Sequence, residues 1–364
     1  MNTKDRINSP TAEHAPWDKP WLENELEILS VCPVCASPER KKLYDGLVDN
    51  VFYCAPGEWT SWRCAQCGCA YLDPRPSPAS IHLAYGNYYT HQDAGPGKAD
   101  YADLSPLRKL RRRLVNGYIN WRYSAQEAPA SPIGGVALWA AWPFRIALDR
   151  EYRHLPRRAA GGGALLDIGC GNGSFLRIAR SCGWDVTGLD PDPKAVANCS
   201  GQGWPVLEGG VEQLDGKEAM FDVITMSHVI EHVHDPVAVM RICHRLLKPG
   251  GRLWLETPNI DSQVHRQYGR NWRGLEPPRH LVLFNRRSLL MALSAAGFAR
   301  IERAPGPSPL SSMTKASEAL KLRRSIDDDI QLDCPQKWLL QKNGLLQAIN
   351  PGKREFLTFV ASKN

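Results

Sequence analysis

The feature that most constrains the fold is the run from Leu165 to Gly173, LLDIGCGNG. Apolar residues followed at once by three closely spaced glycines predict a buried parallel strand that ends in a sharp turn. The apolar-periodic segment that begins at Ser174 predicts a helix directly after this turn. Glycine suits the turn because a backbone without Cβ atoms bends sharply and lets a ligand approach closely.

A second predicted strand, residues 185–189, ends at Asp190. This acid follows the glycine run by roughly twenty residues, the offset at which a carboxylate meets ribose hydroxyls in dinucleotide-binding folds. The two strands, the turn and the helix therefore predict a unit that binds a nucleoside.

The chain has 364 residues, a formal net charge of +7 and 11 cysteines. This size allows one large domain with smaller units, and the modest charge does not require a nucleic-acid partner. The cysteines show no disulfide framework, which favours a reducing compartment. Residues 1–20 lack the apolar run of a signal peptide, so we expect a cytoplasmic protein.

Composition divides the chain into four regions: an extension at 1–30, a cysteine- and aromatic-rich region at 31–89, a helical linker at 90–163 and an α/β domain at 164–364. The linker carries a basic run, 108–113, and an apolar window, 133–148, that is too short to span a bilayer. We expect this window to form a helix packed on the α/β domain; the alternative is a helix at a membrane surface. The glycines 161–163 mark the boundary.

From residue 164 onward, predicted strands and helices alternate as in a doubly wound sheet with a Rossmann-like arrangement. The predicted strands are 164–168, 185–189, 205–208, 221–226, 252–257, 299–304 and 355–361, and the predicted helices are 174–182, 193–200, 236–247 and 287–296. An insertion at 308–353 has helical signals at 315–324 and 336–347 and the position of a lid.

Two Cys-x-x-Cys pairs predict a metal site near the N-terminus. Each pair places two thiolates on one tight turn, and two such turns complete a tetrahedron around zinc. The ligands would be Cys32, Cys35, Cys64 and Cys67, with Cys54 or Cys69 as alternatives for one of them. The intervening segment predicts strands at 51–53 and 59–62, which makes the unit a zinc ribbon. Four protein ligands leave no open position, so the zinc is expected to be structural.

Residues 164–297 resemble a class I S-adenosylmethionine-dependent methyltransferase. The similarity is carried by the glycine run in the spacing Gly169-x-Gly171-x-Gly173, by Asp190, by FDVI at 221–224 and by LLKPGG at 246–251. YLDPRP at 71–76, TPN at 257–259 and WRGLEPPRHL at 272–281 make the chain similar to a bacterial subgroup that carries an N-terminal zinc ribbon and often acts in polysaccharide or natural-product pathways.

The cofactor contacts that this resemblance implies come from four short segments: Asp167, Gly169, Cys170, Gly171, Gly173, Asp190, Pro191, Val211, Glu212 and His228. The glycine loop would lie against the methionine and ribose, and Asp190 would accept hydrogen bonds from the ribose hydroxyls. Gly210 stands where the family often has an acid that binds the adenine amino group. Backbone groups near Val211, or the carboxylate of Glu212, would then recognise adenine.

The candidate catalytic base is His280, with His228 as the second choice, because a histidine can remove the proton of an acceptor hydroxyl. His280 has an alternative role as a residue that holds its loop in place. Arg273 and Arg279 are candidates for binding an anionic acceptor, with a surface ion pair as the alternative role. Trp272 and Tyr268 are candidates for stacking on the acceptor ring, with filling the core as the alternative. Glu231 and His232 look like a metal pair, but neighbours on a helix point in different directions, so we expect no shared metal.

The resemblance implies methyl transfer to a small molecule, with an oxygen of a sugar or secondary metabolite as the acceptor. One alternative is an RNA base methyltransferase that binds RNA through its zinc ribbon, motivated by the basic run. Another is a module without catalytic activity that recruits a partner. The expected partner is a small-molecule acceptor, nucleic acid and membrane contact are minor alternatives, and a homodimer is left open.

Overall fold

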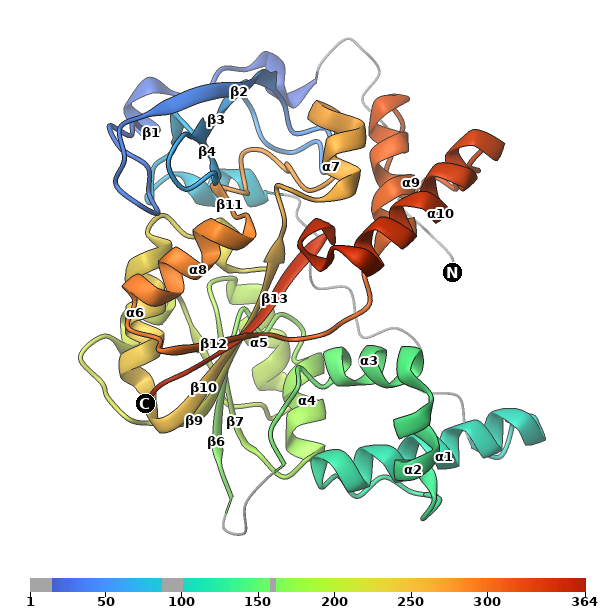
Figure 1. Cartoon of the computed structure of the whole chain (residues 1–364). Helices are drawn as coiled ribbons and strands as arrows, with labels where there is room; N and C mark the ends of the chain where they lie inside the picture. The colour runs from blue at the N-terminus through green and yellow to red at the C-terminus, as the bar shows by residue number, and fades with distance from the viewer. Residues whose placement is uncertain (1–14, 87–100, 158–161) are drawn as a thin grey trace.

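The computed structural model describes residues 15–86, 101–157 and 162–364. The expectations for residues 1–14 of the extension, for residues 90–100 of the linker and for Gly161 of the boundary lie outside the described residues. Figure 1 shows an α/β sheet with the cysteine-rich region stacked above it and the helical linker to one side.

The centre of the molecule is a seven-stranded sheet in the order β12-β13-β10-β9-β6-β7-β8. Strand β13 runs antiparallel to both of its neighbours, and the remaining pairs are parallel. The strands are β6 (Ala164–Ile168), β7 (Asp185–Asp190), β8 (Val206–Glu208), β9 (Phe221–Ser227), β10 (Leu247–Pro258), β12 (Arg300–Arg303) and β13 (Phe356–Ser362). All seven predicted strands of the α/β domain are present, which confirms the doubly wound Rossmann-like class.

Helices cover both faces of this sheet because neighbouring residues of a buried strand point to opposite sides. Leu165 shares a core with Phe175 and Leu176, whereas Leu166 shares one with Met240 of the helix on the other face. These helices are α4 (Ser174–Ser181), α5 (Pro193–Gly201), α6 (Pro236–Leu246) and α8 (Arg286–Ala295), with short 3-10 turns η4 (Val211–Leu214) and η5 (Ile230–His232). Helix α7 (Gln263–Tyr268), followed by η6 (Gly269–Asn271), instead packs in the core of the cysteine-rich region.

The cysteine-rich region forms a second sheet in the order β11-β4-β3-β2. Its strands are β2 (Arg40–Leu47), β3 (Trp59–Cys64), β4 (Ala70–Leu72) and β11 (Val282–Leu283), and β1 (Leu26–Glu27) pairs with β5 (Arg75–Pro76) beside it. Strand β11 comes from the α/β region, so this sheet is completed by a segment more than 200 positions further along the chain. Short 3-10 turns η1 (Pro16–Asp18), η2 (Glu23–Glu25) and η3 (Ile81–Tyr85) flank the sheet.

The predicted strand at 51–53 is wrong. The carboxylate of Asp49 accepts the backbone N–H groups of Phe52, Cys54 and Ala55 at 3.0–3.1 Å, and these bonds fold the segment into a loop. An aspartate that bonds nearby backbone N–H groups competes with strand pairing in this way. The apolar run therefore forms a loop between β2 and β3.

The linker consists of α1 (Pro106–Tyr123), α2 (Gly134–Ala140) and α3 (Trp142–Glu151). The apolar window is thus two helices, because the backbone of Ala141 (φ −87°, ψ 64°) leaves the helical region. Helix α2 packs on α1, where a Cβ on Gly134 would lie 2.3 Å from a carbonyl oxygen of Leu114. Ile133, Val136 and Trp139 stay exposed.

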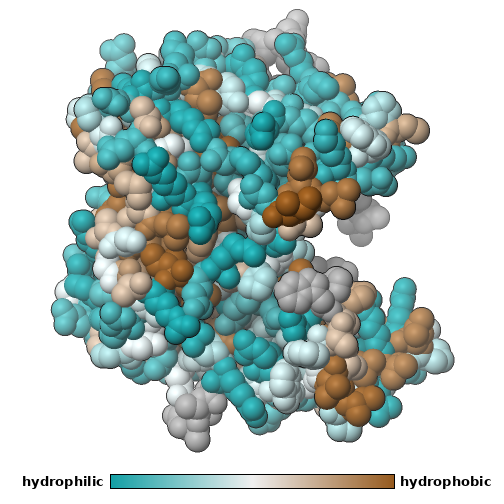
Figure 2. Space-filling model, in the orientation of Figure 1, coloured by the Kyte–Doolittle hydropathy of each residue, from teal (hydrophilic) through white to brown (hydrophobic). Residues whose placement is uncertain are grey.

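The insertion forms α9 (Leu310–Lys321), α10 (Cys334–Ile349) and η7 (Pro351–Lys353), as its helical signals predict. Figure 2 shows a hollow in the side of the molecule between α9–α10 and α1–α3, with apolar side chains over both rims. The exposed apolar residues of α10 are Trp338, Leu345, Leu346 and Ile349. Within the described ranges, every helix is too short or too polar to cross a membrane.

Candidate active site and zinc site

The glycine loop after β6 has a backbone that side chains would disturb. Gly169, Gly171 and Gly173 have φ values of +71°, +53° and +75°, a left-handed region that residues with a Cβ rarely adopt. At Gly169 a Cβ would lie 2.4 Å from Val229. At Gly171 nothing lies within 4 Å of the position that a Cβ would take, so this side of the loop is open.

Asp190 stands at the end of β7 beside the open loop. Its Oδ2 accepts the backbone N–H of Gly171 at 2.8 Å, and its Oδ1 accepts that of Asp192 at 3.0 Å. These two bonds fix the carboxylate while each oxygen keeps a lone pair for a further donor. A ribose with two hydroxyls supplies such donors, so the loop and the acid fit the ribose of S-adenosylmethionine.

Asp167 lies at the base of the same loop and is fully buried. Its Oδ1 pairs with Arg153 and accepts from Thr225 at 2.8 Å, whereas its Oδ2 is buried with no hydrogen-bond partner among the described residues. Burial raises the pKa of Asp167, and Arg153 opposes that rise. A buried oxygen without a donor fits the ammonium of the cofactor's methionine part, reached directly or through water.

Glu212 fills the space that the missing acid of the family would occupy. A Cβ on Gly210 would lie 2.1 Å from Oε2 of Glu212, so this carboxylate folds back over the glycine. Val211 is buried at the start of η4, and its side chain packs into the core. This position is compatible with adenine recognition by the Glu212 carboxylate, and backbone groups near Val211 stay the alternative.

His228 follows β9 and forms an ion-pair cluster with two buried acids. Its Nδ1 lies 3.2 Å from Glu231 Oε1 and its Nε2 lies 3.5 Å from Glu256 Oε1. Burial lowers the pKa of His228, but the bonds to Glu231 and Glu256 outweigh it and raise this pKa to about 9. An imidazolium at neutral pH has no lone pair to accept a proton, so His228 fits cofactor positioning better than base catalysis.

Sequence reasoning missed Glu256 and Arg150. Glu256 is 1% exposed and accepts from Arg150 at 2.9 Å and from Thr358 at 2.8 Å. Arg150 comes from α3, so the linker contributes directly to this end of the sheet. The position of Glu256 at the end of a predicted strand, just before the TPN motif, was the available signal. Nothing comparable marked Arg150 or Arg153 within the linker.

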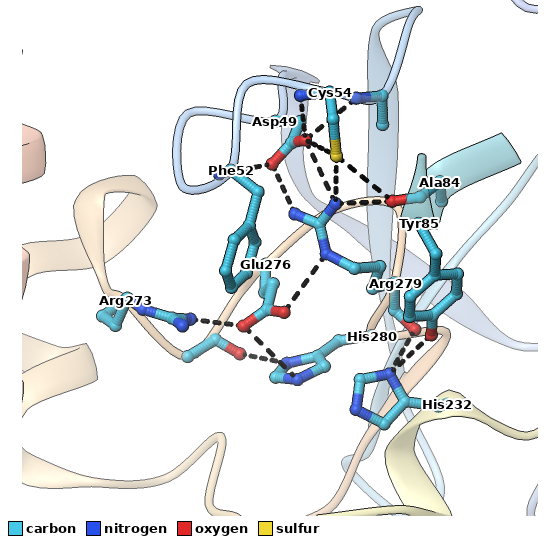
Figure 3. Close-up of polar contacts among 12 residues, drawn as sticks. Asp49, Phe52, Cys54, Ala84, Tyr85, His232, Arg273, Glu276, Arg279 and His280 are labelled. Atoms are coloured by element: carbon cyan, nitrogen blue, oxygen red, sulfur yellow. Dashed lines mark hydrogen bonds and ion pairs between the residues drawn. The ribbon is translucent and has the colours of Figure 1, made fainter. Parts of the chain in front are cut away.

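His280 is buried, and one of its two ring nitrogens carries the lone pair. Its Nδ1 lies 2.8 Å from the carbonyl oxygen of Gly274, so this nitrogen holds the proton and Nε2 is the acceptor. Burial lowers the pKa of His280 to about 4, although Glu276, whose Oε2 lies 3.8 Å from Nε2, opposes the shift. Figure 3 shows His280 below Glu276 and beside His232.

Arg279 is placed where it cannot bind an acceptor, contrary to the sequence-based role. Its side chain is fully buried and pairs with Asp49 of the β2–β3 loop and with Glu276 at 3.2 Å. It also donates to the Ala84 carbonyl at 2.8 Å and lies 4.5 Å from the Phe52 ring centroid (Figure 3). Arg279 therefore joins the cysteine-rich region to the loop that holds His280.

The other three predicted acceptor contacts are structural as well. Trp272 is 1% exposed and Tyr268 is 7% exposed, and both belong to the core beneath the cysteine-rich sheet. Arg273 pairs with the buried Glu276 and is largely covered. These residues fill or brace the core because the 272–281 segment passes under the second sheet, which the sequence did not indicate.

The four predicted zinc ligands come together. The ligand atoms of Cys32, Cys35, Cys64 and Cys67 all lie within 4.8 Å of one another, and the Cys35–Cys64 and Cys32–Cys67 Sγ distances are 3.5 and 3.7 Å. Thiolates around zinc, with Zn–S of about 2.3 Å, stand about 3.8 Å apart in a tetrahedron. The cluster is therefore compatible with a structural zinc ion.

The two alternative zinc ligands, Cys54 and Cys69, differ in their position relative to the cysteine cluster. Cys54 is excluded, because its Sγ lies 3.5 Å from Asp49 and from the Ala84 carbonyl, outside the cluster. Cys69 is buried with its Sγ 3.4 Å from those of Cys32 and Cys67. It remains an alternative for either of these ligands.

Glu231, His232 and His280 also bring one ligand atom each within 4.8 Å of one another. The expectation that Glu231 and His232 would diverge is wrong, because they lie in the tight turn η5 rather than in an α-helix. Nδ1 of His232 lies 3.0 Å from the Arg279 carbonyl, which leaves Nε2 as its acceptor. These three side chains could hold a divalent cation.

Comparison with known proteins identifies the fold that carries this site. A family model described as a methyltransferase domain matches residues 144–303. Together with the strand order, the glycine loop, and Asp167 and Asp190 beside that loop, this match shows that the chain carries a class I S-adenosylmethionine-dependent methyltransferase domain.

The most similar relatives include the ubiquinone biosynthesis O-methyltransferase of Pseudomonas aeruginosa, 40% identical over 178 residues, which are 46% of this chain and 66% of that protein. The corresponding protein of Pectobacterium atrosepticum is 36% identical over 120 residues, 30% of this chain and 50% of that one. The chain thus spans between about half and two thirds of the length of these two curated relatives.

Among solved structures, a methyltransferase from Archaeoglobus fulgidus aligns with a TM-score of 0.40 and 20% identity over 62% of this chain and 94% of its own. Phosphoethanolamine N-methyltransferase 2 of Haemonchus contortus aligns with a TM-score of 0.40 and 19% identity over 61% of this chain and 52% of its own. The cytoplasmic location and the homodimer stay predictions.

Proposed function

We propose that the protein transfers a methyl group from S-adenosylmethionine to an oxygen of a small-molecule acceptor. The single observation that carries the proposal is the arrangement of the glycine loop. Nothing lies within 4 Å of the position that a Cβ on Gly171 would take, and the nearby Asp190 carboxylate is fixed by two backbone N–H groups with lone pairs to spare. The preference for oxygen is supported by the names of the most similar relatives, which are O-methyltransferases.

The residues of the site would bind and orient the cofactor in three places. Asp190 would accept from the ribose, Glu212 would lie at the adenine, and the orphaned oxygen of Asp167 would face the methionine ammonium. When bound, the cofactor supplies a sulfonium-activated methyl group, so the protein needs mainly to align the acceptor. The positive charges of His228 and Arg150 balance the negative charges of Glu231 and Glu256 at the neighbouring strand ends.

His280 would accept the proton of the acceptor hydroxyl at Nε2, because Nδ1 holds its proton against the Gly274 carbonyl. A low pKa makes His280 by itself a weak base. The carboxylates of Glu231 and Glu276 nearby would stabilise the imidazolium that forms on proton transfer. A sugar or secondary metabolite as acceptor rests on the subgroup resemblance alone.

The proposal is tested by measuring transfer of a labelled methyl group from S-adenosylmethionine to a panel of hydroxylated small molecules. His280→Ala is expected to lower turnover about a hundredfold or more while cofactor affinity stays unchanged. His82→Ala, an exposed histidine of the η3 turn, serves as the control. Normal turnover by His280→Ala would remove this residue from the role of base, and failure of the wild type to bind the cofactor would refute the function itself.

A further inference from the structure

A basic groove lies at the edge of the sheet, between α8 and the chain that connects α10 to β13. A cavity of about 690 Å³ is lined by Asn285, Arg286, Arg287 and Gly352, among others. A smaller hollow shares Arg286 and Gly352 with it and adds Arg303, Arg354 and Phe356. The two hollows, of which the smaller holds only about 20 Å³, adjoin at Arg286 and Gly352 and are together called the groove; four arginines line it.

Within the described part of the chain, the positive charge of this groove is not compensated by carboxylates. Among the residues that the structure describes, no carboxylate forms an ion pair with Arg286, Arg287, Arg303 or Arg354, although Arg300 on the same strand as Arg303 is paired with Glu302 at 2.7 Å. The one acid in the wall, Asp261, is neutralised by Arg63. The groove thus carries a net positive charge that a bound anion would balance.

Arg354 shows the effect of this excess charge most clearly. It is half-buried, and its Nη1 donates to the Gly306 carbonyl at 2.6 Å, so a neutral oxygen takes the place of a carboxylate. Burial lowers the pKa of Arg354, and the positive charge of Arg303 lowers it further. Bringing two guanidinium groups together in a partly buried place is unfavourable unless an anion joins them.

The groove is rigidly connected to the site of methyl transfer. The side chain of Asn259, just after β10, donates to the Gly352 and Arg354 carbonyls at 2.9 and 2.8 Å and so fixes the groove wall to the carboxyl end of the sheet. Phe356 lines the smaller hollow of the groove, and its ring centroid is 4.4 Å from that of His228. Ligands of open α/β sheets bind at this end of the strands.

We propose that this groove binds the phosphate groups of the acceptor, which makes the acceptor a phosphate or diphosphate ester. Arginine suits this purpose because its planar fork of donors matches phosphate oxygens. The positive end of α8, which starts at Arg286, adds to the same field. This inference rests on the proposed function, since it assigns the anionic part of that enzyme's acceptor.

The test uses inorganic pyrophosphate as the probe and isothermal titration calorimetry on the full-length protein. Wild type is expected to bind pyrophosphate, with an affinity that falls as salt is raised. Arg286→Ala/Arg303→Ala should weaken binding about tenfold or more, since each change removes charge-assisted hydrogen bonds. Arg300→Ala is the matched control, because Arg300 lies on β12 like Arg303, is exposed and has its own carboxylate partner, Glu302.

The affinity for S-adenosylhomocysteine separates this proposal from the function on which it rests. The double variant should bind S-adenosylhomocysteine as the wild type does, because no groove arginine belongs to the cofactor loop. Equal pyrophosphate affinity in the wild type and the double variant, or an equal loss in Arg300→Ala, would overturn the groove proposal alone. Absence of S-adenosylhomocysteine binding in the wild type would instead count against the methyltransferase function.

Discussion

The buried pair of Arg279 and Asp49 provides the sharpest prediction about how the two sheets hold together. Both side chains are 0% exposed, and Glu276 beside them is 4% exposed. Arg279→Met keeps most of the side-chain volume but leaves the Asp49 carboxylate buried without its cation, whereas Glu276 keeps its ion pair with Arg273. Breaking such a pair by removing one partner costs about 3–5 kcal/mol of unfolding free energy. That is a large part of the 5–15 kcal/mol typical of a folded protein.

The measurement is urea unfolding followed by tryptophan fluorescence, at pH 7 and again near pH 4. Arg279 and the local hydrogen bonds outweigh burial and hold the pKa of Asp49 below its usual value, so the pair stabilises the fold at neutral pH. That stabilisation is lost as the pH falls toward the lowered pKa. In Arg279→Met, burial instead raises the pKa of Asp49. Protonation of Asp49 then removes the buried charge, so the destabilisation should shrink at low pH.

Two comparisons decide whether this reasoning holds. Arg300→Ala breaks an exposed pair, 74% and 60% exposed, and is expected to cost about 0–1 kcal/mol. Asp49→Asn combined with Arg279→Met should cost less than the sum of the single changes, because the two groups share one interaction. A cost for Arg279→Met no larger than that of Arg300→Ala, or one that is equal at pH 7 and pH 4, would refute the account.

Three further predictions concern the metal, the protonated histidine and the glycine loop. Purified protein should contain one zinc per chain by elemental analysis, Cys64→Ser should lose it, and Cys54→Ser should keep it; retention in Cys64→Ser would contradict the ligand set. His228 has its pKa raised to about 9, so it stabilises the fold fully below its unfolded value of about 6.5, and this stability is lost as pH rises through 9. His228→Gln should flatten the dependence of the urea midpoint on pH between 7 and 10; an unchanged slope would argue against the ion pairs. Gly171→Ala should weaken S-adenosylhomocysteine binding strongly, whereas Gly203→Ala, also left-handed and open, should not; equal affinities would show that the open side of the loop is not used.

The sheet was predictable because its signals are local. Each central strand is a short apolar run that ends in a glycine, an acid or a polar turn. Leu165 and Leu166 fill two different cores because neighbouring side chains of a strand point to opposite faces of the sheet. The cofactor loop and the zinc knuckles were predictable for the same reason, since their residues lie within a few positions of one another. Gly169 has the left-handed backbone, and Asp190 the place beside the glycine loop, that the spacing already implies.

The acceptor side was not predictable, because it depends on contacts between distant segments. Arg279 looks like an exposed anion-binding residue in the sequence, and only the β2–β3 loop, about 230 positions away, shows that Asp49 neutralises it. Trp272 and Tyr268 are covered by the second sheet for the same reason. Arg150 reaches Glu256 from a linker whose position on the sheet no local pattern indicated.

The central claim is that the loop after β6 and the acid after β7 hold the adenosyl part of the cofactor, and calorimetric titration with S-adenosylhomocysteine tests it most directly. Wild type should bind one equivalent, and Asp190→Ala should bind about ten- to a hundredfold more weakly, as expected for loss of a charged hydrogen-bond acceptor. Asp185→Ala, at the exposed opposite end of the same strand, should bind as the wild type does. Equal binding by Asp190→Ala, or none by the wild type, would contradict the account.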